Sequence, residues 1–88
     1  MKKELFDKVN NMKLSELDKL LHGNVDDRLQ AAEFNYRLDI LVNDTSDDVR
    51  CEVAIHGYGL DKLVNDPSLC VRMTVAIQEI QSNKDDVN

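Results

Sequence analysis

Three arginines at a fixed spacing are the residues whose type and pattern first suggest chemistry. Arg28, Arg50 and Arg72 lie 22 residues apart. A guanidinium binds carboxylate or phosphate through a rigid fork of N–H groups, so three at equivalent positions could hold an anionic ligand. They could instead pair with nearby aspartates while their aliphatic stems cover apolar surface. Because acidic residues lie close to all three, we interpret the arginines as structural.

Aspartates are concentrated at the turns that precede these arginines. They are Asp26, Asp27, Asp44, Asp47, Asp48 and Asp66. Acids at helix N-termini cap the helix and interact favourably with its dipole. One residue per turn suffices for capping, yet Asp27 and Asp48 each follow another aspartate. The alternative is therefore that the turns form a negative ridge that meets a basic protein groove and imitates a nucleic-acid backbone.

The sequence contains no pattern for catalysis or metal binding. His22 and His56 do not belong to a ligand cluster, and Cys51 and Cys70 lack zinc spacing. No Ser–His–Asp set or glycine-rich phosphate loop is present. We expect the cysteines to be buried or half-buried free thiols in a reducing cytoplasm. We accordingly expect a protein that is not an enzyme and needs neither cofactor nor metal.

Composition limits the class of partner. The chain has 88 residues, enough for one small domain, and 17 acidic against 11 basic side chains give a net charge of −6. Nucleic acid and anionic membranes repel such a chain. No apolar run approaches the ~20 residues of a membrane span. We expect a cytoplasmic protein whose partner is another protein with a basic surface, a nucleic-acid-binding effector being one such partner.

The arginines belong to a longer internal repeat. Residues 38–56 read LDILVNDTSDDVRCEVAIH and residues 60–78 read LDKLVNDPSLCVRMTVAIQ, with twelve identical positions. A fixed period in this range is typical of stacked helical repeats. We predict a single domain over residues 1–81, made of the units 17–37, 38–59 and 60–81 behind an N-terminal cap at 1–16.

Each unit is expected to fold as two short helices. In the last unit Leu60, Leu63 and Val64 share one face of the first helix. Asp66 is placed to cap a second helix over 67–81, with Pro67 in its first position. That helix is expected to bury Val71 and Val75, with Met73 and Ile77 as further core candidates. In the middle unit Val49, Val53 and Ala54 should face inward.

The ends of the predicted helices differ along the chain. Helix 46–56 ends at Gly57, which favours the left-handed conformation, and Asn35 holds the equivalent position one unit earlier. No such residue ends the last helix, which can run on; the polar tail 82–88 is expected to fray. At the other end an amphipathic stretch covers the stack, with the apolar residues Leu5, Phe6, Val9 and Met12.

The pattern D-x-S-x-x-V-R-x-x-V-A occurs twice, beginning at Asp44 and at Asp66. It resembles HEAT-like repeats of the short branch that includes the PBS-lyase HEAT-like and variant leucine-rich repeat families. The resemblance covers residues 17–81 and implies an all-α fold, a short right-handed α-solenoid of about three helical pairs with an N-terminal helical cap. It also implies a ladder that pairs Asp44 with Arg50 and Asp66 with Arg72, or each arginine with an adjacent unit's aspartate. His22 replaces the first aspartate and departs from this pattern.

These observations predict a non-enzymatic protein-interaction module. Its predicted partner-binding residues are Asp26, Asp27, Asp44, Asp47, Asp48, Tyr36 and Tyr58, and its ladder residues are Arg28, Arg50, Arg72 and Asp66. The two tyrosines share a repeat position, where they could pack between units or anchor a partner. One alternative is a small phage-encoded inhibitor, such as an anti-CRISPR protein, and another is an enzyme accessory or DNA-repair relative. We expect a monomer or a weak dimer formed by the C-terminal face.

Overall fold

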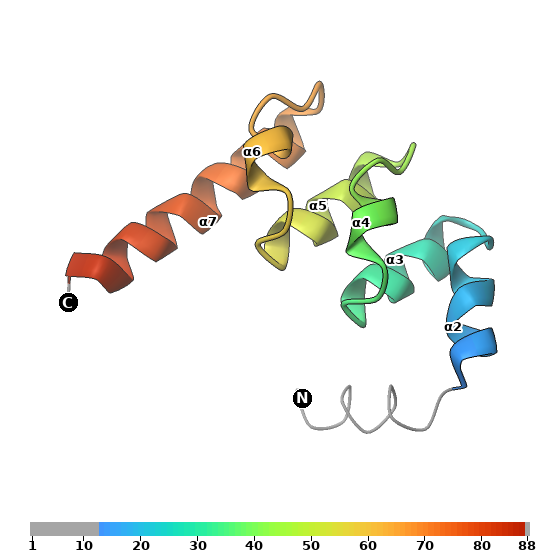
Figure 1. Cartoon of the computed structure of the whole chain (residues 1–88). Helices are drawn as coiled ribbons and strands as arrows, with labels where there is room; N and C mark the ends of the chain where they lie inside the picture. Colours follow the sequence, from blue (N-terminus) through green and yellow to red (C-terminus); the bar gives the residue numbers. More distant parts are fainter. Residues whose placement is uncertain (1–12, 88) are drawn as a thin grey trace.

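A computed structural model describes the backbone of residues 13–87 and the side chains of residues 13–81 (Figure 1). Within that range the chain is helical and contains no strand, which confirms the predicted all-α class. The helices are α2 (Leu14–Leu21), α3 (Val25–Glu33), α4 (Leu38–Leu41), α5 (Asp47–Ile55), α6 (Leu60–Leu63) and α7 (Leu69–Val87). The apolar residues Leu5, Phe6, Val9 and Met12 of the expected N-terminal cap lie outside the described residues.

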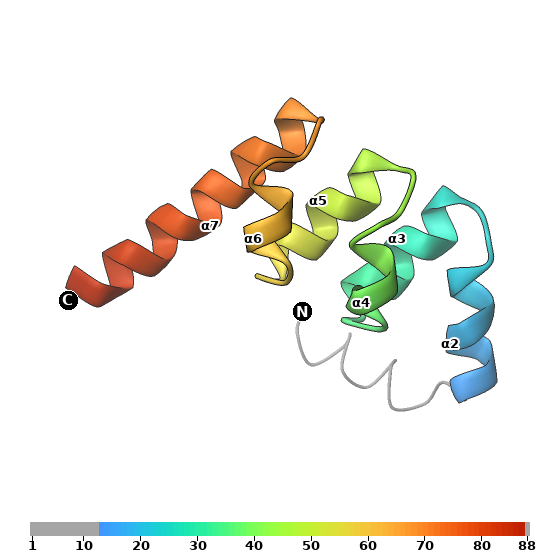
Figure 2. The same ribbon diagram turned by 45° about the horizontal axis from the view of Figure 1, so that its top comes forward.

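The single-turn helices α4 and α6 alternate with the longer helices α3, α5 and α7, and the helices pack in sequence order. Helix α3 packs against α5, and α5 packs against α7, so the longer helices lie side by side (Figures 1 and 2). The single-turn helix α4 contacts both α3 and α5, and α6 contacts both α5 and α7 in the same way. Each short helix therefore fills the space between two successive long helices.

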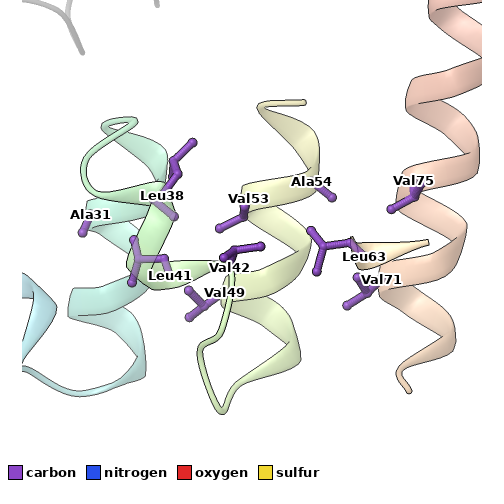
Figure 3. Close-up of a cluster of buried hydrophobic side chains, with 11 residues drawn as sticks. Ala31, Leu38, Leu41, Val42, Val49, Val53, Ala54, Leu63, Val71 and Val75 are labelled. Carbon is purple, nitrogen blue, oxygen red and sulfur yellow. The ribbon is translucent and has the colours of Figure 1, made fainter. Parts of the chain in front are cut away.

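The core is a continuous cluster of small and branched apolar side chains along this row (Figure 3). Leu41 and Leu63 come from the single-turn helices, and both are fully buried. Leu38 of α4 and Val42 just after it also belong to the cluster, and the long helices contribute Ala31, Ala32, Val49, Val53, Ala54, Val71 and Val75. Burying a Val or Leu side chain contributes about 1.5–3 kcal/mol relative to exposure, so this cluster is the main stabilising feature.

The predicted core is confirmed at most positions and wrong at a few. Val49 and Val71 occupy equivalent positions and are both fully buried, as the repeat predicted. Met73 and Ile77 were candidates for burial on α7, but both are exposed. Val64, expected to share the inward face of its helix, is exposed as well. The reason is the same for Met73 and Val64: among the described residues, no further unit packs against that side of the last helical pair.

Helix α7 begins later and ends later than the sequence predicted. Helix α7 begins at Leu69, so Pro67 lies in the preceding turn and not in the first helical position. The carboxylate of Asp66 accepts a hydrogen bond from the backbone N–H of Ser68 at 2.9 Å, and Asp44 bonds Ser46 in the same way. A turn closed by this side-chain hydrogen bond therefore occupies the residues where the first helical turn was predicted. At its other end α7 continues to Val87, past the predicted end at 81 and through most of the tail expected to fray.

Each link between units contains two residues in the left-handed backbone conformation. Gly57 has φ of 76° and Asn35 has φ of 62°, which confirms the helix-ending role predicted for these equivalent positions. Two residues later, Gly59 and Arg37 are also left-handed, immediately before the short helices. A Cβ added to Gly59 would lie 2.7 Å from a methyl of Val42, so glycine also permits close packing there.

Candidate functional site

The turns that join α2 to α3, α4 to α5 and α6 to α7 lie along one side of the molecule (Figures 1 and 2). We call this side the acidic edge and define it by the aspartates in and just after the three turns, Asp26, Asp27, Asp44, Asp47, Asp48 and Asp66. These residues do not share one role. Two are bound by arginines, two make other structural contacts, and two are left unbound.

Arginine ion pairs connect successive turns of the acidic edge. Arg28 Nε lies 2.7 Å from Asp44 Oδ2, and Arg50 Nε lies 2.8 Å from Asp66 Oδ2. In both pairs Nη2 also donates to the second carboxylate oxygen, at 3.2 and 3.1 Å. Each arginine therefore binds the aspartate of the following unit, which is the adjacent-unit form of the ladder and not the pairing within a unit.

The remaining Nη1 group of each arginine donates to the backbone of its own turn. Arg28 donates to the carbonyl of Gly23 at 2.8 Å, and Arg50 to that of Asp44 at 2.7 Å. Arg72 makes the equivalent bond to the Asp66 carbonyl at 2.6 Å. Among the described residues, however, no carboxylate pairs with Arg72. The ladder thus has two complete rungs and one arginine that lacks its carboxylate.

The two complete rungs are largely removed from solvent. The side chains of Asp44 and Asp66 are 7% and 6% exposed. The hydrogen bonds from Arg50 hold the pKa of Asp66 below its ordinary value, and the carboxylate raises the pKa of Arg50 in return. Partly buried bidentate ion pairs of this kind are strong, and removing one partner lowers the stability of the fold because it leaves the other charge buried and unpaired. Asp44, predicted to bind a partner, is therefore assigned to the ladder together with Asp66.

Asp27 and Asp47 make specific structural contacts that the sequence analysis did not assign to them. Asp27 and Asn24 form a reciprocal capping box at the start of α3, with bonds of 2.9 and 3.3 Å. The spacing of an N-cap residue and an acid three positions later is a signal for this motif. Asp47 accepts a hydrogen bond from the Ser68 hydroxyl of the next unit at 2.8 Å. No local sequence signal indicates that contact, because its partners are 21 residues apart.

Asp26 and Asp48 are the aspartates of the acidic edge that remain unbound. Both are exposed, and within the described residues neither forms a hydrogen bond or an ion pair. They are 22 residues apart and hold the same repeat position, one residue into α3 and α5 respectively. Helices α3 and α5 pack against each other, and packed helices lie about 8–10 Å apart, so we expect the two carboxylates to be separated by roughly that distance.

The two tyrosines have different surroundings despite sharing a repeat position. Tyr36 is half-buried, and its hydroxyl donates to Asp18 Oδ1 at 2.6 Å, which ties α2 to the link after α3. That hydrogen bond to the carboxylate raises the pKa of Tyr36. Asp39, the repeat equivalent of Asp18, pairs with Arg37 instead, and Tyr58 is exposed. Tyr36 therefore has a structural role, and Tyr58 stays a candidate for partner contact.

The described residues assemble no other reactive site. No group of three His, Cys, Asp or Glu side chains in this part of the chain is placed to hold a metal ion. Burial raises the pKa of the Cys51 thiol, whereas Cys70 is exposed, contrary to the expectation that both cysteines are at least half-buried. None of the described helices combines the length and apolar character needed to cross a membrane.

The comparisons with known proteins supply no relative. No protein-family model, curated protein or solved structure matches the chain. The resemblance to HEAT-like repeats therefore stays a prediction.

Proposed function

We propose that this chain is a protein-interaction module that binds a basic surface of another protein through Asp26 and Asp48 of the acidic edge. The observation that carries the proposal is that these two carboxylates are exposed, unpaired and at equivalent positions of adjacent helices. Lysine or arginine side chains of a partner, spaced by about the width of a helix, would fit them. Asp47 next to Asp48 adds charge, because its carboxylate is also exposed.

The ladder supports this role by fixing the surface beneath the free carboxylates. Arg28 and Arg50 clamp successive turns, so α3 and α5 are held in one relative position. A surface that is ordered before binding loses less conformational entropy on association. The net charge of −6 favours encounter with a basic protein and opposes encounter with nucleic acid.

The proposed architecture is a short right-handed α-solenoid of HEAT-like helical pairs. Its support is that α3, α5 and α7 pack side by side and that the ladder contacts recur with the 22-residue interval of the sequence. In such an array equivalent residues of successive units lie along one edge. An array of this kind would bring Asp26 and Asp48 beside one another.

The alternative function is that of a small phage-encoded inhibitor, such as an anti-CRISPR or other anti-defence protein. The regular placement of Asp26 and Asp48 favours it, because spaced unpaired carboxylates can imitate the phosphates that a nucleic-acid groove binds. The two functions differ in one outcome. An inhibitor of this kind competes with nucleic acid for its target, whereas an adaptor binds without displacing it.

The test needs a charge reversal at the acidic edge and a matched reversal elsewhere. After capture of the partner from the native host and its identification by mass spectrometry, we would compare Asp26→Lys plus Asp48→Lys with Glu16→Lys plus Asp61→Lys. All four acids are exposed and lie in the first turn of a helix, so the two double variants change the net charge by the same amount and at the same kind of position. Glu16 lies in the first turn of α2 and Asp61 in the first turn of α6, and neither belongs to the acidic edge.

We expect the reversal at Asp26 and Asp48 to weaken partner binding by about tenfold or more and to flatten its dependence on salt. The control reversal at Glu16 and Asp61 should retain most of the affinity. Equal losses in the two variants would mean that only net charge matters. No loss in either would reject the acidic edge as the binding surface.

A further inference from the structure

The last helical pair leaves exposed the positions that earlier units bury. Ala32 of α3 and Ala54 of α5 are completely buried, whereas Ala76 at the same position of α7 is exposed. Val42 is 7% exposed, but its equivalent Val64 is 42% exposed. In the earlier units a following helical pair covers these positions. Among the described residues, therefore, nothing covers this side of α7.

The uncovered side of α7 is more apolar than the surfaces it corresponds to. Leu69, Met73, Ala76 and Ile80 are all exposed and follow one another by four, three and four residues. That spacing places them in one stripe along three turns of helix, which we call the α7 stripe. Leu69 replaces Asp47 of the previous unit, and Ile80 replaces Tyr58. Single exposed apolar residues are ordinary, but a continuous stripe of this kind indicates an interaction surface.

A basic and an acidic residue, Arg72 and Glu79, lie along the same flank of the α7 stripe. Arg72 precedes Met73, and Glu79 precedes Ile80, so the two residues are separated by two helical turns. Both are exposed. Arg72 has no carboxylate partner among the described residues, and Glu79 forms no hydrogen bond or ion pair there. Among the described residues, the surface thus carries a cation that is bound to a backbone carbonyl but to no carboxylate, and an anion that is bound to neither, beside an apolar seam.

This surface is complementary to itself. If two α7 helices pack antiparallel along their stripes, Leu69 of one copy meets Ile80 of the other, and Met73 meets Ala76. The same alignment brings Arg72 of each copy beside Glu79 of the other, and two-fold symmetry makes the pair twice. The antiparallel arrangement therefore satisfies both the apolar stripe and the flanking charges.

We propose that the α7 stripe is the interface of a two-fold symmetric homodimer with antiparallel α7 helices. A head-to-tail stack of copies fits less well. In such a stack Arg72 of one copy would need a carboxylate from the first unit of the next copy. His22 occupies the position that Asp44 and Asp66 hold in the other units, so the first unit has no carboxylate there. The dimer goes beyond the proposed binding function. It gives one particle two acidic edges, which increases avidity for a target with two basic sites.

The apolar part of the interface is tested by one substitution and one matched control. Sedimentation velocity and light scattering of the full chain would be recorded over a range of concentrations, with reductant present so that the exposed Cys70 forms no disulfide. We expect a reversible dimer. Ile80→Asp should make the chain monomeric at concentrations where wild type dimerises. Ile40→Asp, an exposed isoleucine on α4 away from the stripe, should leave the dimer unchanged.

The charge pairs test the antiparallel alignment itself. Arg72→Glu alone and Glu79→Arg alone should each raise the dimer dissociation constant by about tenfold, because both symmetric pairs become repulsive. The double variant restores opposite charges and should restore dimerisation. A purely structural role of Arg72, through the Asp66 carbonyl, would not be rescued by the change at Glu79.

Two results would overturn the proposal. A wild-type chain that stays monomeric up to about 1 mM would show that the α7 stripe is not a self-association surface, since contacts weaker than this have little binding free energy. A dimer in which the double charge variant is no better than the single variants would show that the helices do not pair in this antiparallel alignment. Circular dichroism of every variant would confirm that the helices remain folded.

Discussion

Arg50 and Asp66 form a bidentate ion pair that joins adjacent units across sixteen residues of sequence. The same guanidinium donates to the carbonyl oxygen of Asp44 in its own turn. Arg28 repeats this arrangement with Asp44 and Gly23. One side chain therefore fixes two consecutive turns at once, and Asp44 takes part in both rungs, through its carboxylate and through its backbone.

The first prediction concerns the geometry of this ion pair. Arg50→Lys keeps the charge but loses the fork that reaches Asp66 and the Asp44 carbonyl together, so the free energy of unfolding should fall by about 1–3 kcal/mol. The control is Arg37→Lys, because Arg37 and Asp39 form a pair whose side chains are 47% and 55% exposed. That change should cost less than about 1 kcal/mol in urea unfolding. Equal effects would show that the buried rung adds nothing to stability.

The second prediction concerns the pH dependence of stability. Asp66 has its pKa lowered in the folded state by Arg50, so its ion pair stabilises the fold above the unfolded value of about 3.9. This contribution is lost as pH falls through the lower folded pKa. Burial raises the pKa of Glu52, so protonation of Glu52 acts in the opposite direction.

Urea unfolding of wild type and Asp66→Asn between pH 3 and pH 7 separates these effects. The variant should be less stable at neutral pH, and its deficit should shrink as the pH drops below about 4. A deficit that does not change with pH would mean that Asp66 acts through its neutral hydrogen bonds, such as the one from Ser68, and not through its charge.

The third prediction concerns the glycines between units. Gly59→Ala would place a methyl group 2.7 Å from Val42 Cγ2 at a φ of 67°, so it combines a clash with backbone strain. Gly57→Ala has similar strain at φ of 76° but meets no atom within 4 Å. We expect a loss of about 1 kcal/mol at Gly57 and a clearly larger loss at Gly59. Thermal unfolding of both variants provides the comparison, and equal losses would show that Val42 moves aside without cost.

The fourth prediction tests whether the units are equivalent in their packing. Val49→Ala and Val71→Ala each remove two methyl groups from completely buried sites, so each should cost about 1–2 kcal/mol of unfolding free energy. Val25→Ala, at an exposed valine on α3, should change stability by less than about 0.5 kcal/mol. Neutral effects at both buried positions would contradict the assignment of these residues to one shared core.

The internal repeat was sufficient to predict the helical class and much of the core. The burial of Val49 and Val71 was predicted correctly, because the spacing of apolar residues on a helix indicates which side packs against the core. Met73 and Val64 were not, since their equivalents are covered by a following unit and the sequence of one unit does not show whether another follows it. Burial at the end of an array depends on neighbours and not on local pattern.

The candidate site was predicted only in outline. The aspartates do gather at successive turns, but the sequence could not distinguish the bound carboxylates from the free ones. Asp44 is bound by Arg28 and Asp47 by Ser68, and both contacts cross between units. Asp48, next to Asp47 in the chain, points its charge to solvent and is unbound. The ladder pattern allowed a pairing within a unit or between adjacent units, and only the stacking of the units decides between them; nothing in the sequence indicated the contact of Asp47 with Ser68.

The last prediction separates stability from binding at two adjacent residues, Asp47 and Asp48. Ser68→Ala removes the hydroxyl that donates to Asp47, so it should lower the free energy of unfolding by about 0.5–1.5 kcal/mol. It leaves both carboxylates charged and exposed, so partner affinity should stay within about twofold of wild type.

Asp48→Lys should do the reverse, because it removes an unbound surface charge and breaks no described contact. It should weaken binding and reduce the salt dependence, while urea unfolding changes by about 1 kcal/mol or less through the helix dipole. If Ser68→Ala weakens partner binding and Asp48→Lys does not, the stacking of the units, and not the free charge at Asp48, controls recognition.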